Sequence, residues 1–319
     1  MSPKTTETLE LDGRTLSLSN RAKVLWPQDG YTKGDLVAYY RAIAPYILPH
    51  LAGRPLTLQR YPDGIDGSSF FEKNASRFLP SWVPTVTVKS EFGRQDTIRF
   101  ILCNDEAVLV YVANLAAIVL HVWTSRDGSL DVPDFVFFDL DPYEGCTLAT
   151  LAKVALGLRG ALAEVRLDAR VKSSGGSGLH VVIPLVPEYG YDACKSFAEI
   201  AARTLNGRLP KLTTLERAPA KRPPGTVYLD YVQVGRGKTL VAPFSARARA
   251  GAPVSMPLDW SEIETMSRKR STQPEREFAR FTIKNTPSLL AKHGDLWAGS
   301  DWPGQRLEAA LTKARTVWR

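Results

Sequence analysis

The chain has 319 residues, of which 41 are Lys or Arg and 33 are Asp or Glu, so its net charge is +8 and its pI is about 9.4. This excess of positive charge favours a polyanionic partner such as a nucleic acid, whose phosphates it can neutralise. The three cysteines, Cys103, Cys146 and Cys194, are scattered and lack Cys-x-x-Cys spacing, which argues against a zinc site and suits a reducing cytoplasm.

The sequence offers no predicted membrane span. The N-terminal residues are polar, and the longest apolar run, Ala107 to Val122, is interrupted by Asn114 and His121 and is too short to cross a bilayer. We therefore expect a cytoplasmic, nucleoid-associated protein. No Gly/Ser linker, low-complexity tract or repeat divides the chain, so the sequence predicts one large two-lobed unit over residues 1–319.

The first predicted element is a hairpin over residues 9–18 that turns at Asp12-Gly13. A helix is expected after Thr32, because Thr32 and Asp35 have the spacing of a capping box. The later elements are strands at 132–138, 169–174, 179–185, 226–233 and 240–244, helices at 148–165 and 191–205, and a helical segment at about 257–319. This order predicts an α/β (α+β) fold. The basic run at 267–271 is interpreted as a solvated face, with DNA contact as the alternative.

An acidic pair, Asp139 and Asp141, stands at the carboxyl end of the strand at 132–138. Alternate residues of a strand share a face, so both carboxylates point the same way and Leu140 turns into the core. Two like charges at that distance repel one another unless a cation lies between them, and Mg²⁺ or Mn²⁺ prefers such oxygen ligands. The alternative is a polar strand end followed by a helix start.

A glycine turn connects the next two strands, at Ser174 to His180. Its glycines allow the backbone to approach a ligand, and consecutive N–H groups in such a turn form an anion nest. His180 beside an apolar run is compatible with a purely structural role, but it shares the turn with Ser174 and Lys172. We therefore favour contact with phosphate.

A third carboxylate, Asp230, lies in the strand at 226–233 and is followed by a glycine loop that carries Lys238. The end of this loop, Gly237-Lys238-Thr239, looks like the end of a P-loop, but the first glycine of that motif would have to stand where Val232 is. A hairpin fits better, with Lys238 at its turn and Arg247 past its end. A solvated basic hairpin is the alternative.

These motifs occur in the order DLDP (139–142), SGGSGLHVVIPL (174–185) and YLDYVQVGRGKTLVAPFSARARAGAPVSMPLDW (228–260). The order resembles the polymerase domain of bacterial ligase D, a branch of the archaeo-eukaryotic primase superfamily. Blocks nearer the N-terminus agree with the same family in the same order: AKVLWP (22–27), YTK (31–33), LAGRP (51–55) and FFEK (70–73). The resemblance covers nearly the whole chain and implies a primase-like core of two lobes with mixed or antiparallel sheets flanked by helices.

The resemblance also implies the roles of individual residues. Asp139, Asp141 and Asp230 would hold two metal ions, Mn²⁺ or Mg²⁺, for nucleotidyl transfer. The residues implied in contact with the incoming NTP or dNTP, or nearby in its pocket, are His121, Ser174, His180, Gln233, Lys238 and Arg247, to which the glycine turn adds Lys172.

In the same family Lys23 and Lys33 would bind the 5′-phosphate of the strand downstream of a gap or break. Phe70 and Phe71 would stack on an exposed base there. Alternation along a strand predicts that one of these two rings is buried in the core and the other exposed.

The chain departs from the family pattern at two places. Ser177 stands where the glycine turn commonly carries a lysine, which removes one positive charge from the nucleotide site. The stretch at 216–225 corresponds to a mobile loop that carries an arginine in relatives, a role that Arg222 would fill.

The resemblance therefore implies a repair polymerase that adds nucleotides, with ribonucleotides preferred, at breaks or short gaps in non-homologous end joining. Its implied partners are DNA ends or gapped DNA, Ku and a separate ATP-dependent DNA ligase. Gap filling in excision repair and primer synthesis are alternatives within the same enzyme class. A non-catalytic DNA-end binding module is an alternative of another class, and the three retained carboxylates argue against it, since unneeded buried acids cost stability.

Overall fold

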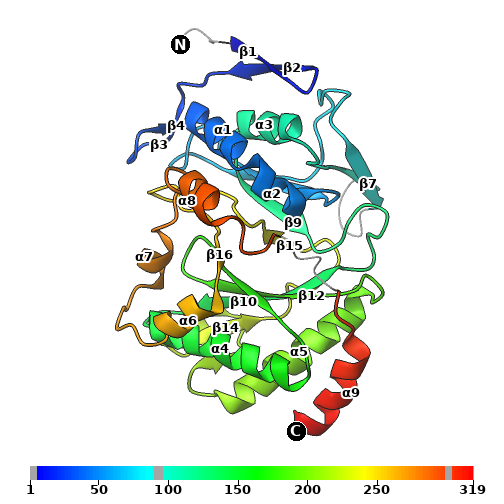
Figure 1. Ribbon diagram of the computed structural model, residues 1–319, viewed down its shortest axis with the longest axis vertical. Coiled ribbons are helices and arrows are strands. Elements are labelled where there is room, and N and C mark those ends of the chain that lie inside the picture. The colour runs from blue at the N-terminus through cyan, green and yellow to red at the C-terminus, as the bar shows by residue number, and fades with distance from the viewer. Residues whose placement is uncertain (1–5, 90–95, 299–303, 319) are drawn as a thin grey trace. The chain divides into compact units, whose positions relative to one another are not determined.

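The computed structural model describes residues 6–89, 96–298 and 304–318, and these residues form two compact units (Figure 1). Unit 1 comprises the described residues up to Asp127 together with Thr239–Ser255 and Phe281–Asp295. Unit 2 comprises Gly128–Lys238, Met256–Arg280 and the described residues from Leu296 onward. The chain therefore passes between the units several times.

Unit 1 is built around a four-stranded antiparallel sheet with the strand order β15-β9-β5-β6. Two-stranded ribbons, β1-β2, β3-β4 and β7-β8, accompany it. The elements of unit 1 are β1 (Thr6–Leu11), β2 (Arg14–Ser19), β3 (Val24–Trp26), β4 (Tyr31–Thr32), α1 (Lys33–Ala42), α2 (Ala44–Leu51), β5 (Leu56–Arg60), β6 (Phe70–Glu72), β7 (Thr85–Lys89), β8 (Thr97–Ile101), α3 (Glu106–Asn114), β9 (Ala117–Trp123), β15 (Thr239–Val241) and α8 (Thr286–His293).

Two local predictions in unit 1 are confirmed. The hairpin β1-β2 turns at Asp12 and Gly13, whose φ angles of 50° and 71° are those of a tight turn that glycine favours. Helix α1 begins with a capping box in which the Thr32 side chain accepts from the Asp35 N–H and the Asp35 carboxylate accepts from the Thr32 N–H.

Unit 2 is built around a six-stranded sheet with the order β13-β14-β10-β12-β11-β16, antiparallel except for the β13-β14 pair. Helices α4 and α5 pack against this sheet and against each other (Figure 1). The elements of unit 2 are β10 (Phe135–Pro142), α4 (Leu148–Glu164), β11 (Arg170–Ser173), β12 (Leu179–Pro184), α5 (Tyr191–Arg208), β13 (Thr213–Thr214), a 3₁₀ turn (Pro219–Lys221), β14 (Val227–Asp230), β16 (Pro257–Leu258), α6 (Trp260–Met266), α7 (Pro274–Phe278) and α9 (Leu307–Val317). The predicted mixed α/β fold is confirmed.

The sheet of unit 2 is held by the burial of its two central strands. Strand β12 is buried along its whole length, and Phe137 and Phe138 of β10 are fully buried. Burying each such ring contributes roughly 2–3 kcal/mol. Helix α4 begins at the predicted place, where the Thr147 side chain accepts from the Thr150 N–H.

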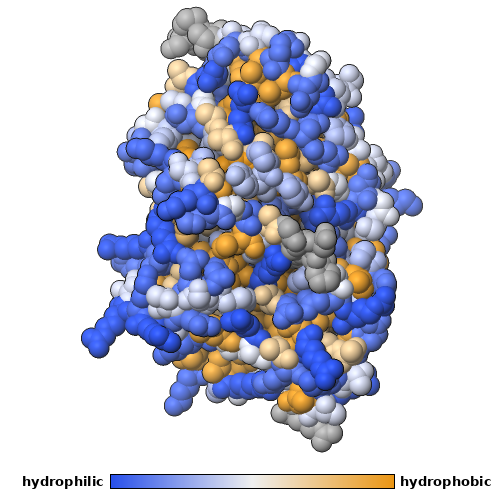
Figure 2. All heavy atoms as spheres, viewed as in Figure 1, coloured by the Kyte–Doolittle hydropathy of each residue, from blue (hydrophilic) through white to orange (hydrophobic). Residues whose placement is uncertain are grey.

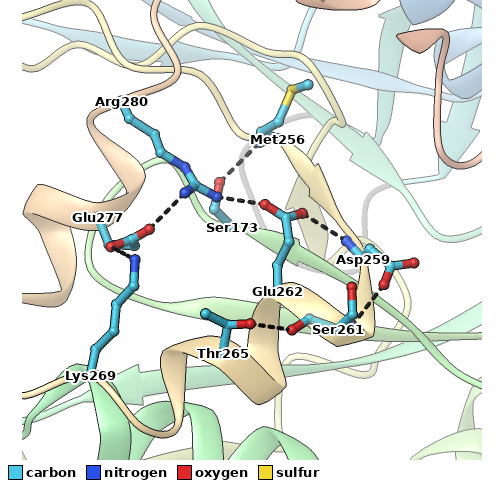
Figure 3. Close-up of polar contacts among 9 residues, drawn as sticks. All are labelled: Ser173, Met256, Asp259, Ser261, Glu262, Thr265, Lys269, Glu277 and Arg280. Atoms are coloured by element: carbon cyan, nitrogen blue, oxygen red, sulfur yellow. Dashed lines mark hydrogen bonds and ion pairs between the residues drawn. The ribbon is translucent and has the colours of Figure 1, made fainter.

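The segment 256–280 is fastened within unit 2 by the polar contacts of Figure 3. Ser173 and Met256 exchange two hydrogen bonds, Ser173 N–H to the Met256 carbonyl (2.8 Å) and Met256 N–H to the Ser173 Oγ (3.0 Å). Arg280 donates to both Glu262 (2.6 Å) and Glu277 (2.8 Å), and so connects α6 to α7. These contacts fix both ends of the segment.

The basic run at 267–271 lies between α6 and α7. Lys269 donates to Glu277 at 2.8 Å, while Arg268 and Arg270 are exposed. The run therefore has the solvent-facing arrangement expected from the sequence. Hydrophilic side chains also cover much of the face shown in Figure 2, interrupted by smaller apolar areas.

Several predicted boundaries are wrong. The strand predicted at 132–138 begins at Phe135 and runs to Pro142, because Asp139–Pro142 pair with β14. The strand predicted at 226–233 ends at Asp230, where the chain turns and the Val234 N–H donates to the Tyr231 carbonyl. The segment predicted to be helical from residue 257 begins with a short strand, β16.

The hairpin predicted around Lys238 is also wrong. Strand β14 pairs with β10 and β13, whereas β15 pairs with β9, so the two strands belong to different sheets. Because β14 and β15 are adjacent in the sequence, they were expected to pair with each other. Each is instead buried in a different sheet.

The apolar run at 107–122 is divided between α3 and β9 by a turn at Leu115 and Ala116. Among the described residues, none of the helices combines the length and the apolar character that crossing a bilayer requires.

Candidate functional site

Four titratable residues form a row across the sheet of unit 2. On successive strands β14, β10, β12 and β11, Asp230 lies opposite Asp139, Asp139 opposite His180, and His180 opposite Lys172. Directly opposed residues of antiparallel strands project from the same face of a sheet. Residues separated by up to about ninety positions in the sequence therefore gather their side chains on one face.

The carboxylates of this face are partly exposed. Asp139 is 36% exposed at its side chain, and its Oδ1 lies 3.5 Å from the Nε2 of the nearly buried His180. Asp141 is also partly exposed, whereas Leu140 between them is fully buried. The predicted alternation is thus confirmed. Asp230 accepts from the Gln233 side chain and from the Val232 N–H, each at 3.1 Å.

Arg222 neutralises Asp141. Its Nη1 donates to the Asp141 Oδ2 at 3.0 Å, and its guanidinium carbon lies 3.9 Å from the centre of the Tyr228 ring. Its Nε and Nη2 donate to the carbonyls of Glu216 and Arg217, within the loop that precedes β14. Burial, followed by the charge of Asp230, raises the pKa of Tyr228 to about 12, so this ring remains neutral.

The donor set suits divalent cations. Three carboxylates on two adjacent strands offer hard oxygen ligands, as Mg²⁺ and Mn²⁺ prefer. No group of three or more His, Cys, Asp or Glu side chains is closed around a common point among the residues that the structure describes. Arg222 donates to the Oδ2 of Asp141, and a carboxylate has a second oxygen that can bind a cation.

The glycine turn between β11 and β12 is shaped by Ser174. The Ser174 Oγ accepts from the N–H groups of Gly176 and Gly178, each at 3.1 Å, and the Ser174 N–H donates to the Gly178 carbonyl at 2.9 Å. A Cβ atom added to Gly178 would lie 2.7 Å from the Leu140 carbonyl oxygen. The turn therefore packs directly against the strand of the acidic pair, which only glycine permits.

The remaining predicted residues of unit 2 differ in exposure. Lys172 is fully buried, with its Nζ 3.5 Å from the Ser173 carbonyl, whereas Lys238 is exposed on the turn closed by its N–H bond to the Gly235 carbonyl. Arg236 on the same turn donates to Asp131 at 2.7 Å. Lys172 is thus buried at the β11 position of the row, while Lys238 is open to solvent.

Unit 1 carries the other predicted residues of the nucleotide set. His121 lies on β9, opposite Thr57 of β5 and Val241 of β15, and the ring of Phe71 meets it edge-on with centroids 5.7 Å apart. Arg247 is half-buried in the loop after β15. Its N–H donates to the Pro253 carbonyl (2.8 Å), and its own carbonyl accepts from the Trp26 indole (3.3 Å).

Unit 1 also brings Lys23 and Lys33 together through the ribbon β3-β4. The Lys33 N–H donates to the Lys23 carbonyl at 2.8 Å. The Lys33 side chain is buried, and its Nζ donates to the Ser19 Oγ (3.2 Å) and the Asn114 carbonyl (3.0 Å). Burial, and then the charges of Lys23 and Arg60, lower the pKa of Lys33 to about 8. An anion that brought negative charge to these cations would relieve that repulsion.

The prediction that one of Phe70 and Phe71 is buried is wrong, because both rings are exposed, by 46% and 58%. Strand β6 has three residues and forms the edge of its sheet. Neither ring packs into the core. The Arg60 guanidinium carbon lies 5.2 Å from the centre of the Phe70 ring, and the Phe71 ring contacts that of His121. Both rings therefore present a face to solvent.

Arg60 is the residue that sequence reasoning missed. It lies opposite Phe70 in the β5-β6 pairing, donates to Glu72 at 2.7 Å, and adds its charge to those of Lys23 and Lys33. A lone arginine at the end of an apolar strand carries no signal of this role, since the pairing of β5 with β6 creates it.

The comparisons with known proteins agree with these features. Residues 32–297 match the family model of the LigD primase-polymerase domain. The chain is 34% identical over 286 residues to the multifunctional non-homologous end joining protein LigD of Mycolicibacterium smegmatis, covering 89% of this chain and 36% of that protein. It is 30% identical over 280 residues to the bifunctional non-homologous end joining protein LigD of Bacillus subtilis, covering 88% and 43%.

Among solved structures, the polymerase domain of Mycobacterium tuberculosis ligase D in complex with DNA matches with a TM-score of 0.79 and 31% identity, covering 91% of this chain and 99% of that one. The fold is therefore that of a polymerase-type nucleotidyltransferase domain. The chain belongs to the LigD primase-polymerase domain family. It spans about a third of the length of the Mycolicibacterium relative.

Proposed function

We propose that the protein is a template-directed polymerase that adds nucleotides to a 3′-hydroxyl at DNA breaks or short gaps in non-homologous end joining. The observation that carries this proposal is the opposition of Asp139 and Asp230, with Asp141 on the same strand as Asp139. Three carboxylates held by adjacent strands are the ligand set that two-metal phosphoryl transfer needs. Membership of the LigD primase-polymerase family supports the same chemistry.

Asp139, Asp141 and Asp230 would hold two divalent cations, Mg²⁺ or Mn²⁺. When bound, such ions would supply Lewis-acid activation of the attacking 3′-hydroxyl and neutralise charge on the departing pyrophosphate. Arg222, which pairs with the Asp141 Oδ2, would share this carboxylate with a cation bound to its second oxygen, or would be displaced by it.

The residues proposed to bind the incoming nucleotide act by charge and hydrogen bonding. In unit 2, His180 and Ser174 offer polar contacts at the glycine turn, Lys238 offers an exposed cation, and Lys172 lies buried opposite His180. Gln233 orients Asp230 through their hydrogen bond. In unit 1, His121 and Arg247 are proposed to contact the triphosphate. The guanidinium of Arg247 is well suited to bind phosphate.

A DNA end is the proposed partner of the cluster in unit 1. Lys23 and Lys33 would bind a downstream 5′-phosphate, and Phe70 and Phe71 would stack on an exposed base. The convergence of three cations, Lys23, Lys33 and Arg60, supports a phosphate ligand, and the exposure of both rings supports stacking. The net charge of +8 favours a nucleic acid in general.

Three further features of the proposal rest on the family. Ribonucleotides are the preferred substrate, and Ku and a separate ATP-dependent DNA ligase are the partners in end joining. The relatives named above are end-joining proteins whose length exceeds that of this chain, so ligation would fall to another domain or protein. Ser177 replaces the turn lysine of the family, which leaves the other cations to neutralise the triphosphate.

Primer extension on a gapped duplex tests the proposal. Wild-type protein should extend the 3′ end in the presence of Mg²⁺ or Mn²⁺, with ribonucleotides incorporated faster than deoxynucleotides. Asp139→Ala should abolish extension while leaving DNA affinity nearly unchanged, because this carboxylate acts on the chemistry rather than on the duplex.

Glu199→Ala serves as a matched control, because Glu199 is a surface carboxylate on α5 that pairs with Arg203. Extension by Asp139→Ala at the wild-type rate would contradict the assignment of the metal site. Tight DNA binding by the wild-type protein without any extension would instead favour the non-catalytic end-binding module. Synthesis on an unprimed template would favour the primase alternative.

A further inference from the structure

The loop that carries Arg247 contains a strained residue. Phe244 has a φ of +62° and is fully buried. A bulky side chain rarely adopts this left-handed conformation, and it persists only where the surrounding structure enforces it. Such strain is often located where a functional side chain must be held in one orientation. Arg247 follows three residues later.

The enforcing contacts surround the Phe244 backbone and ring. Its N–H donates to the Ser255 carbonyl at 2.7 Å, and its carbonyl accepts from the Tyr39 hydroxyl, also at 2.7 Å. Its ring packs against that of His50, with centroids 5.7 Å apart. Tyr39 lies on α1, so a helix about two hundred residues earlier in the chain fixes the strained turn.

The neighbouring Tyr40 holds the next two residues. Its hydroxyl donates to the Ile118 carbonyl (2.8 Å) and accepts from the Ala246 N–H (3.2 Å). The Ser245 Oγ accepts from the Leu120 N–H at 2.9 Å, which connects the same segment to β9. Burial raises the pKa of both tyrosines well above the usual value, so both hydroxyls keep their protons.

Every backbone N–H from Phe244 to Arg247 is therefore engaged. In chain order, the four acceptors are the Ser255 carbonyl, the Ala242 carbonyl, the Tyr40 hydroxyl and the Pro253 carbonyl. The Trp26 indole also donates to the Arg247 carbonyl, at 3.3 Å, and Trp26 is fully buried. Because Phe244, Ser245 and Ala246 are buried, their N–H groups need such partners, and one of them, the Tyr40 hydroxyl, comes from a helix far away in the sequence.

We propose that Tyr39 and Trp26 are positioning residues that set the direction of the Arg247 side chain through this strained segment. They touch no ligand themselves. Tyr39 fixes the carbonyl of Phe244, and Trp26 fixes the carbonyl of Arg247. The inference rests on the proposed function, in which Arg247 contacts the triphosphate of the incoming nucleotide.

A double-mutant cycle with Arg247 tests this role. The variants are Tyr39→Phe, Arg247→Ala and the combination, assayed for nucleotide KM and kcat on a gapped duplex at saturating DNA. Tyr39→Phe removes one oxygen and should raise the nucleotide KM about tenfold, as for a ligand contact displaced by a fraction of an ångström. Its affinity for DNA should stay within about twofold of wild type.

The decisive measurement is the nucleotide KM of the double variant, Tyr39→Phe with Arg247→Ala. If Tyr39 acts through Arg247, adding Tyr39→Phe to Arg247→Ala should change the nucleotide KM less than about twofold, because the positioned group is already gone. If Tyr39 had only a structural role, Tyr39→Phe would lower the melting temperature equally in the wild type and in Arg247→Ala. It would also change the nucleotide KM by the same factor in both proteins. Trp26→Phe removes the indole donor to the same loop together with part of a buried ring, so its melting temperature is measured beside its nucleotide KM, which should show the same non-additivity.

Tyr111→Phe is the matched control, because Tyr111 is a half-buried tyrosine on α3 of the same unit, packed against Trp82. It should leave the nucleotide KM unchanged. An unchanged KM in Tyr39→Phe, or the same tenfold rise in both backgrounds, would overturn the inference. If Arg247→Ala keeps wild-type kinetics, the proposed role of Arg247 is wrong, and the inference falls with it. This result comes from the Arg247 variant alone, so it is distinguished from a failure of the inference, which the Tyr39 variants report.

Discussion

Replacing Lys33 by methionine should make the protein more stable at neutral pH. Burial holds the pKa of Lys33 at about 8 instead of its usual 10.5, so below pH 8 the folded protein carries a charge that its environment disfavours. The difference between 10.5 and about 8, at about 1.4 kcal/mol for each pH unit, corresponds to about 3 kcal/mol. Methionine fills a similar volume without the charge.

The gain is reduced by the hydrogen bonds that the variant loses. The Lys33 Nζ donates to the Ser19 Oγ and to the Asn114 carbonyl, and leaving these acceptors without the ammonium costs about 0.5–1.5 kcal/mol each. The net expectation is a free energy of unfolding higher by up to about 2 kcal/mol at pH 7.

The pH dependence gives the sharper test. Below pH 8 Lys33 is protonated in both folded and unfolded states, so the wild type carries the full penalty. Between about 8 and 10.5 the unfolded chain binds the proton that the folded chain has released, so wild-type stability rises with pH relative to the variant. The difference in stability between Lys33→Met and wild type should therefore shift by about 3 kcal/mol in favour of the wild type across that window, so the variant is the less stable protein at its upper end.

Urea unfolding followed by circular dichroism at pH 7, 8, 9 and 10 measures this difference. Lys195→Met is the matched control, because Lys195 is an exposed lysine on α5 of unit 2 and, unlike Lys23, is not among the charges that lower the pKa of Lys33. A stability difference between Lys33→Met and wild type that stays constant from pH 7 to 10 would refute the reasoning. So would a variant less stable than wild type at every pH.

Two further predictions address the ligand sites. Asp63→Asn should increase the preference for a gap with a 5′-phosphate over the same gap with a 5′-hydroxyl by about 0.5–1 kcal/mol, because it frees Lys23 from its 2.7 Å ion pair. Fluorescence anisotropy at one salt concentration measures the two affinities. Equal affinities for the two gaps in both wild type and variant would contradict the prediction. Gly178→Ala should lower kcat/KM for nucleotide about tenfold or more in primer extension, since the new Cβ would lie 2.7 Å from the Leu140 carbonyl and push the glycine turn off β10. Gly190→Ala, where an added Cβ meets no atom within 4 Å, is the control for Gly178→Ala, and equal kinetics of the two variants would exclude close packing as a requirement.

Local signals in the sequence were sufficient for the elements whose turn and capping residues lie within a few positions of one another. The Asp12-Gly13 turn, the capping box at Thr32 and the start of α4 at Thr147 each depend on side chains that bond to their own neighbours. Strand alternation also placed Leu140 inside and its two aspartates outside. These features follow from local stereochemistry, which is the same in any fold.

The order of the motifs determined the family, because several ordered blocks are far more specific than any one of them, and the match over residues 32–297 confirms it. The roles of individual residues remain predictions, since they came from that resemblance.

The pairing of the strands depends on tertiary contacts that no short stretch of sequence shows. The sequence suggested that β14 and β15 form a hairpin, but each is buried in a different sheet. Pairing also placed Arg60 beside Phe70, and it left both Phe70 and Phe71 exposed on a short edge strand. Which strand becomes an edge depends on contacts between residues far apart in the chain, so no local pattern records it.

The tertiary structure likewise decided which charges are buried and which are paired. Nothing around Lys33 in the sequence shows that its side chain is buried beside Asn114, or that its pKa falls to about 8. Nothing around Tyr39 shows that it fixes a strained turn at Phe244. The burial and the pKa of a side chain depend on neighbours from many segments of the chain. The sequence contains those neighbours but not their distances.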